Sequence, residues 1–218
     1  MKKRTGMMIQ HVLFIHCLII CAILFAVKGE GMANEEAKYA VITKDGVFEL
    51  RQYESHIVAE TMVEGDFDKA GSDGFRRLFK YISGGNQKKQ SIGMTAPVSQ
   101  DAGPEKIAMT APVSQERTGG KWRIAFVMPS EYTLDTLPEP ADPKVSLRQV
   151  PSRRMAAITY SGFWSRERYE KHRALLETLM LKKKLQPFGE PVLARYNSPF
   201  TLWFLRRNEV LIPVQVTE

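Results

Sequence analysis

The sequence predicts an α+β fold, a curved antiparallel sheet or distorted β-barrel that carries two helices. Short runs of alternating apolar and polar residues, typical of half-buried strands, recur after residue 38. Two longer segments, from about 66 to 84 and from 165 to 184, instead have apolar residues at helical spacing. The order strand, strand, helix, strand, strand occurs twice. This order predicts a pseudo-twofold ββαββ repeat within a single domain over residues 39–214.

Residues 1–33 have the pattern of a secretory signal. A basic head at 2–4 precedes an apolar run from 12 to 27, and small residues precede a cleavage site expected after Ala33. The alternative is an uncleaved membrane anchor, because residues 9–27 number 19 and about 20 can span a bilayer. Both interpretations place the rest of the chain across the membrane. We therefore expect an exported protein, periplasmic or secreted, with membrane association through residues 9–27 if the signal is uncleaved.

Cysteine content and charge exclude several classes of protein. Cys17 and Cys21 both lie inside the apolar run, so a chain cleaved after Ala33 has no cysteine. Disulfides, thiolate ligands and covalent cofactor attachment through C-x-x-C-H are then excluded. The net charge of +7 falls to +4 when the leader is removed with its four basic residues and one acidic residue. A small positive excess suits an anionic ligand. No nucleic-acid partner is expected, because no basic stripe with interleaved aromatic residues occurs.

The first predicted repeat unit begins with two strands and a helix. Residues 47–53 and 57–63 alternate in polarity and predict strands joined by a turn at Glu54-Ser55-His56. Asp66 is placed to cap a helix that ends at Gly84-Gly85. Two glycines, Gly71 and Gly74, weaken its first turns because glycine has a low helix propensity.

Two near-identical segments follow, 92–100 and 107–115, which match at eight of nine positions. Each has strand chemistry up to its proline. Pro97 and Pro112 lack the amide donor that a central strand needs, so we expect both at a sheet edge or bulge. Residues 129–143, with four prolines, predict a surface connection.

The second predicted unit repeats this order around a helix. Ser165 caps a helix that runs to about Lys184, with His172 in its inner stripe between Tyr169 and Leu176. The remaining predicted strands share apolar, β-branched alternation and lie at 122–128, 145–150, 155–160, 191–196 and 209–214.

Six strings in a fixed order carry a resemblance to a known family. They are Phe48–Tyr53, the Met-Thr-Ala-Pro-Val pair at 94–98 and 109–113, Phe126–Ser130, Tyr160–Phe163, Ala194–Phe200 and Arg206–Val210. From about Tyr39 to Val214 the chain resembles the SOUL haem-binding family, in its bacterial exported branch. The family implies a two-helix distorted β-barrel that binds haem or a related tetrapyrrole non-covalently, as a carrier, buffer or scavenger, with no established catalysis.

The resemblance implies a haem cleft at the junction of helix and sheet. Phe75, Phe79 and Lys80 fall where animal relatives place cleft residues, and Arg76 adds a second cation for the haem propionates. His172 and Tyr196 complete the candidate set. The alternative for the first four is an ordinary amphipathic helix, with its aromatic side chains in the core and its cations in solvent.

The iron ligand stays open at this point. Some relatives carry a histidine in the string Tyr-Glu-x-Arg-His-Tyr. This chain has Gln52 at that position. We expect His56, in its predicted turn, to be solvated, and His172 to be a half-buried helix residue rather than a ligand. Tyrosine is an alternative ligand, with Tyr53 or Tyr196 available, and haem can also be held by its faces and propionates alone.

Two other functions compete with haem binding. A carrier of another amphipathic molecule, as in the effector-binding domains of bacterial regulators, needs nearly the same pocket. A hydrolase that uses carboxylates and water ranks below both, because no phosphate loop, nucleophile elbow or H-E-x-x-H helix occurs. We therefore expect a monomeric binding protein rather than an enzyme.

Overall fold

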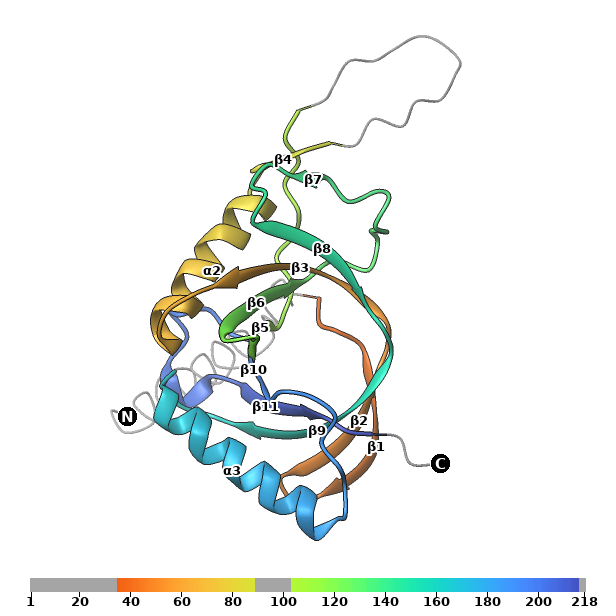
Figure 1. The fold of residues 1–218 in the computed structure, drawn as a ribbon, viewed down its shortest axis with the longest axis vertical. Helices are drawn as coiled ribbons and strands as arrows, with labels where there is room; N and C mark the ends of the chain where they lie inside the picture. Colours follow the sequence, from red (N-terminus) through yellow and green to blue (C-terminus); the bar gives the residue numbers. More distant parts are fainter. Residues whose placement is uncertain (1–34, 89–102, 216–218) are drawn as a thin grey trace, which may run out of the picture. The chain divides into compact units, whose positions relative to one another are not determined.

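The computed structural model describes residues 35–88 and 103–215. The predicted leader and the first Met-Thr-Ala-Pro-Val segment lie outside the described residues. The described chain forms a curled nine-stranded sheet with two helices on its outer side (Figure 1). All strand pairings in this sheet are antiparallel. The predicted α+β class, with a curved antiparallel sheet and two helices, is confirmed.

The elements follow one another in the predicted alternation. Their bounds, in chain order, are β1 Tyr39–Asp45, β2 Phe48–Tyr53, β3 His56–Val63, α2 Phe67–Ile82, β4 Asn86–Gln87, β5 Val113–Thr118, β6 Lys121–Val127, β7 Glu139–Pro140, β8 Val145–Val150, β9 Arg153–Tyr160, α3 Arg166–Lys182, β10 Val192–Arg195, the 3-10 turn η1 Trp203–Leu205, and β11 Asn208–Pro213. The short strands β4 and β7 pair with each other, apart from the main sheet.

The order of strands in the sheet carries the predicted repeat. That order is β1-β2-β9-β11-β10-β5-β6-β3-β8. Without β1, this order is symmetrical about the β10–β5 pair. β5 then corresponds to β10, β6 to β11, β3 to β9 and β2 to β8. The helices obey the same relation, because α2 packs on β3 and β6 while α3 packs on their counterparts β9 and β11.

Alternation along the strands separates two faces of the sheet. One face carries the main core, in which side chains of both helices pack against residues such as Ile124, Phe126, Ile158 and Val210. The opposite, concave face carries two smaller apolar clusters, one around Met155 and Leu211 and another formed by Val58, Ala125 and Val150. The helices therefore cover one face only, and the concave face is left for polar groups and cavities.

Close approach to the sheet explains the glycines of α2. Asp66 caps this helix as predicted and accepts a hydrogen bond from the Lys69 amide at 2.8 Å. A Cβ atom at Gly74 would lie 2.3 Å from Ile124 Cγ1, and one at Gly71 would lie 2.8 Å from Gln115 Oε1. The two glycines lower helix propensity, but they also let the helix backbone lie directly on β5 and β6.

The prediction of a strand before Pro112 is wrong. β5 begins at Val113, and before it only Ala111 forms an isolated bridge, to Glu36. The amides of this segment bond elsewhere: Ile107 N donates to Ile82 O, and Ala111 N donates to Glu35 O. Because proline has no amide donor, the ladder can start only after residue 112. The structure also has a strand that was not predicted, β1. It lies at the edge of the sheet and its side chains are mostly exposed.

Candidate functional site

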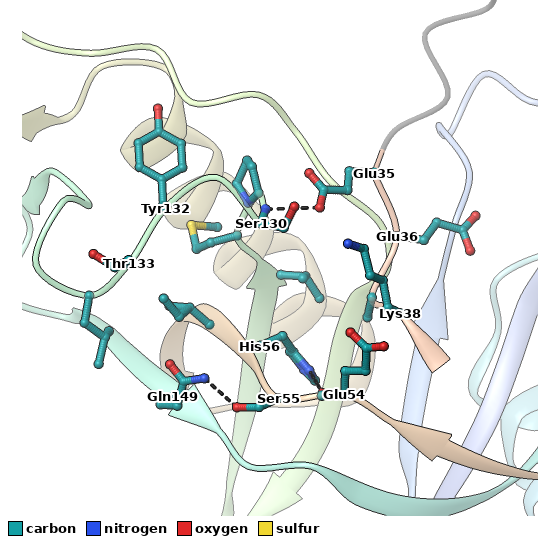
Figure 2. A pocket seen from close by; sticks show the side chains of 16 residues that line it. Glu35, Glu36, Lys38, Glu54, Ser55, His56, Ser130, Tyr132, Thr133 and Gln149 are labelled. Atoms are coloured by element: carbon teal, nitrogen blue, oxygen red, sulfur yellow. Dashed lines mark hydrogen bonds between the residues drawn. The ribbon is translucent and has the colours of Figure 1, made fainter. Parts of the chain in front are cut away.

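A cavity opens at one end of the curled sheet. It has a volume of about 360 Å³, within the usual range for small-molecule sites. Its walls come from the lead into β1 at 35–38, the β2–β3 turn with the start of β3, and the loop after β6 at 127–134 (Figure 2). Apolar walls are supplied by Ile57, Val127, Met128 and Pro129. We call this space the main cavity.

A smaller cavity of about 70 Å³ lies on the concave face. It shares Ala37, His56 and Val127 with the main cavity, so the two adjoin. Its walls include apolar side chains such as Val58, Met155 and Leu211, and four charged side chains, Glu116, Arg123, Arg148 and Arg153. We call this smaller space the annex.

His56 stands at the junction of the two cavities. The expectation of a solvated turn residue is wrong, because His56 is the first residue of β3 and is half-buried. Its Nδ1 lies 2.9 Å from the carbonyl oxygen of Glu54. A carbonyl only accepts, so Nδ1 carries the hydrogen, and in the neutral ring the lone pair is on Nε2.

Burial lowers the pKa of His56, and the positive charges of Arg153 and Arg148 lower it further. The hydrogen bond to the Glu54 carbonyl acts in the opposite direction and raises the pKa. The neutral ring is therefore favoured. A neutral imidazole whose other nitrogen donates to a backbone carbonyl is the form in which histidine binds metal ions. Of all described side chains in the two cavity walls, His56 alone has an imidazole.

A buried polar network fills another part of the concave face. Glu209, fully buried, accepts hydrogen bonds from Arg51, Thr159 and Tyr196. The Tyr196 hydroxyl donates to Glu209 Oε2 at 2.7 Å, and burial, followed by the Glu209 charge, raises the Tyr196 pKa. Tyr196 was a predicted candidate, and its hydroxyl is engaged in this network instead of lining either cavity.

A second group of charged residues borders the annex. Arg148 donates to Glu60 from Nε at 3.1 Å and from Nη2 at 2.8 Å. Arg123 pairs with Glu116 through Nη1, and its Nε lies 3.6 Å from Glu60. Arg153 lies beside these two pairs, half-buried, and its side chain makes no hydrogen bond or ion pair to any described residue.

The predicted α2 residues lie on the helix-covered side of the sheet. Phe75 and Phe79 stack at 5.9 Å between ring centroids, and Phe75 also packs on Phe126 at 5.3 Å. Phe79 is 47% exposed, and Arg76 and Lys80 are exposed. None of these four residues lines either cavity. Their assignment to a haem cleft stays a prediction.

His172 is a packing residue, as expected from its helical position. Its ring stacks on Tyr160 with centroids 3.8 Å apart, and Nδ1 lies 2.6 Å from the carbonyl of Arg168, one turn earlier. The stacking of His172 on Tyr160 joins α3 to β9. Among the described residues no group of three or more histidine, cysteine or acidic side chains could hold a metal ion.

The family model described as SOUL heme-binding protein matches residues 34–213. Curated relatives carry related names. "Heme-binding protein 2" of Homo sapiens is 30% identical over 200 residues, which cover 82% of this chain and 93% of the relative. "Heme-binding protein 1" of Xenopus laevis is 31% identical over 153 residues, which cover 69% of this chain and 76% of the relative.

Solved structures share the fold at much lower identity. The C-terminal domain of EcmrR has a TM-score of 0.51 and 9% identity, covering 82% of this chain and 99% of that domain. A protein from Listeria innocua described as a hydrolase has a TM-score of 0.51 and 11% identity. The match covers 80% of this chain and 94% of that protein. At these identities the likeness concerns the fold alone.

Proposed function

Because the chain belongs to the SOUL heme-binding protein family, we propose that it binds haem or a related tetrapyrrole. The observation that carries this function is the family match over residues 34–213, which includes all but the last two described residues. The relatives named heme-binding proteins, at about 30% identity, support it. Binding is non-covalent in this proposal, because the only cysteines, Cys17 and Cys21, precede the matched region.

The main cavity suits such a ligand. Haem is a flat apolar disc with two carboxylates, and it needs apolar walls, nearby cations and, for ligation, a nitrogen, sulfur or oxygen donor. Ile57, Val127 and Pro129 supply apolar wall. Figure 2 shows Lys38, the one lysine of the wall, together with Glu35, Glu36 and Glu54. We propose the main cavity as the haem site, with the neutral His56 offering Nε2 to the iron.

The proposed role is that of a carrier, buffer or scavenger rather than of an enzyme. The chain's own residues would bind the disc, orient it and hold its carboxylates. The wall of the main cavity combines apolar side chains with one imidazole, one lysine and the carboxylates of Glu35, Glu36 and Glu54, and we propose that this set serves binding. We also propose that the protein is monomeric.

Export is the proposed location, supported by the basic head, apolar run and small-residue exit of residues 1–33. No helix among the described residues is long and apolar enough to cross a membrane. Intact-mass analysis of the protein recovered from a bacterial host should give a chain that begins at Asn34. Recovery of the chain from Met1 in the membrane fraction would instead favour an uncleaved anchor.

Titration of the purified protein with haemin and with protoporphyrin IX tests the function. We expect saturable binding of both, seen as a shifted Soret band for haemin and as quenched tryptophan fluorescence for both. A matched titration of free tryptophan with each compound corrects for inner-filter absorption. A protein that binds neither compound above the non-specific background would contradict the proposal.

A further inference from the structure

Arg153 is a half-buried cation on the concave face. It begins β9, opposite Tyr53 of β2, and its side chain lines the annex. The two other arginines of the annex are paired, Arg148 with Glu60 and Arg123 with Glu116. Arg153 has no such partner among the described residues. The annex therefore contains one more guanidinium group than the local ion pairs use.

The surroundings make this cation costly without an anion. Burial lowers the pKa of Arg153, and of its charged neighbours Glu116 raises it while Arg148 and Arg123 lower it. Arginine nevertheless stays protonated in proteins, so the charge persists. Glu116 forms no ion pair with Arg153 and offsets the lost hydration of this half-buried charge only in part, so an incoming anion would offset more of it.

The size of the annex limits what that anion can be. The annex has a volume of about 70 Å³, against about 360 Å³ for the main cavity, so it suits a small group such as a carboxylate better than a ring system. Small or short apolar residues, Ala37, Ala125, Ala194 and Val58, form part of its wall. Glu116 beside Arg153 favours a single negative charge over a phosphate dianion.

The junction with the main cavity indicates where the carboxylate comes from. Ala37, His56 and Val127 belong to the walls of both spaces. A flat ligand in the main cavity could therefore extend a short carboxylate arm past His56 into the annex. This geometry fits an amphipathic ring compound with propionate-like side chains.

We propose that Arg153 forms an anion subsite, which binds one carboxylate arm of a ligand whose apolar body occupies the main cavity. For haem as that ligand, the inference rests on the proposed function. Arg153 acts as a specificity residue that distinguishes the free acid from its ester or amide. Lys38 at the rim of the main cavity would serve the second carboxylate.

The first arm of the test compares haemin with its dimethyl ester on Arg153→Gln. Loss of a charge-assisted hydrogen bond should weaken haemin binding roughly 10- to 100-fold, while the affinity for the ester stays within about twofold. Arg153→Lys should recover part of the haemin affinity. The matched control is Arg166→Gln, which removes one exposed arginine of α3 and should leave both affinities at wild-type values.

The second arm needs no haem. Sodium propionate should raise the melting temperature of the wild-type protein but not of Arg153→Gln, and propionamide should raise neither. Without ligand the variant should melt at or above the wild-type temperature, because it removes an unpaired cation, so a fold defect would be recognised.

The two arms separate the two proposals. If haemin does not bind the wild-type protein but propionate still stabilises it through Arg153, the proposed function fails and the subsite stands. If haemin binds Arg153→Gln as it binds wild type, and propionate stabilises neither protein, the subsite is overturned and the proposed function stands.

Discussion

Arg51 and Glu209 form a two-pronged ion pair across an intervening strand. Arg51 Nη1 lies 2.8 Å from Oε2 of Glu209, and Nη2 lies 3.1 Å from Oε1. The pair joins β2 to β11 over β9, and both side chains are almost completely excluded from solvent. Since Thr159 and Tyr196 also donate to the carboxylate, Glu209 is the centre of a satisfied buried network.

The Glu209→Gln variant should be strongly destabilised. It leaves the buried guanidinium of Arg51 without its full counter-charge, and breaking one partner of a buried pair costs about 3–5 kcal/mol. Urea unfolding followed by tryptophan fluorescence measures the loss. Glu177→Gln, which removes an exposed partner of Arg173, should cost less than about 1 kcal/mol. Equal losses of unfolding free energy in the two variants would show that the buried Glu209 network stabilises the protein no more than an exposed ion pair does.

Gly74→Ala should destabilise the protein although alanine favours helices. The added methyl group would lie 2.3 Å from Ile124 Cγ1, so α2 must move away from β6. Overpacking of this kind costs about 1–3 kcal/mol. Gly103→Ala is the matched control, because its Cβ would meet nothing within 4 Å. An unchanged melting temperature for Gly74→Ala would mean that the helix seat is looser than the structure shows.

His56→Ala should remove an imidazole signature from the haem spectrum. If His56 Nε2 ligates the iron, the variant should shift the Soret band and the electron paramagnetic resonance signal of the ferric complex. Added imidazole should restore the wild-type spectrum by entering the space left by the side chain. His172→Ala, at a packing position on Tyr160, should keep the wild-type spectrum. The reverse pattern would assign the ligand to α3.

His56 should also contribute a pH dependence to stability. Its pKa in the folded protein is lowered by burial, so near pH 6.5 the unfolded chain takes up a proton that the folded chain does not. The stabilising contribution is complete above about pH 6.5 and is lost as pH falls toward the folded-state pKa. The difference in unfolding free energy between wild type and His56→Gln should therefore shift against the wild type between pH 7.5 and 5. A shift in its favour would contradict the neutral, buried ring.

The outer face of α2 can be tested as the alternative haem site. Phe79→Ala and Lys80→Glu alter residues that line neither cavity, so we expect both variants to bind haemin as the wild type does. A Phe79 ring fully covered by porphyrin would instead contribute about 1.5–3 kcal/mol, and Lys80→Glu would then weaken haemin more than its dimethyl ester. Measured losses of that size would move the site to α2, as the family resemblance implied.

Local signals in the sequence were sufficient for most of the fold. The cap at Asp66, the cap at Ser165 and the alternation of residues 47–53 are short-range patterns, and each element they predicted is present. β1 escaped prediction because its side chains are mostly exposed and its structure depends on pairing with β2. The strand predicted before Pro112 is absent for a related reason. The backbone amides of this segment donate to α2 and to the lead into β1, and not to a neighbouring strand of the sheet.

The candidate site was decided by tertiary structure. Alternation shows that neighbouring residues of a strand face opposite ways, but not which face the helices cover. Only the curl of the sheet brings His56, Glu116 and Arg153, from three different strands, to the same small space. The sequence alone determined a two-helix, antiparallel α+β fold and its family. The unpaired state of Arg153 and the fixed tautomer of His56 depend on partners distant in sequence or on local backbone geometry, which only the folded chain defines.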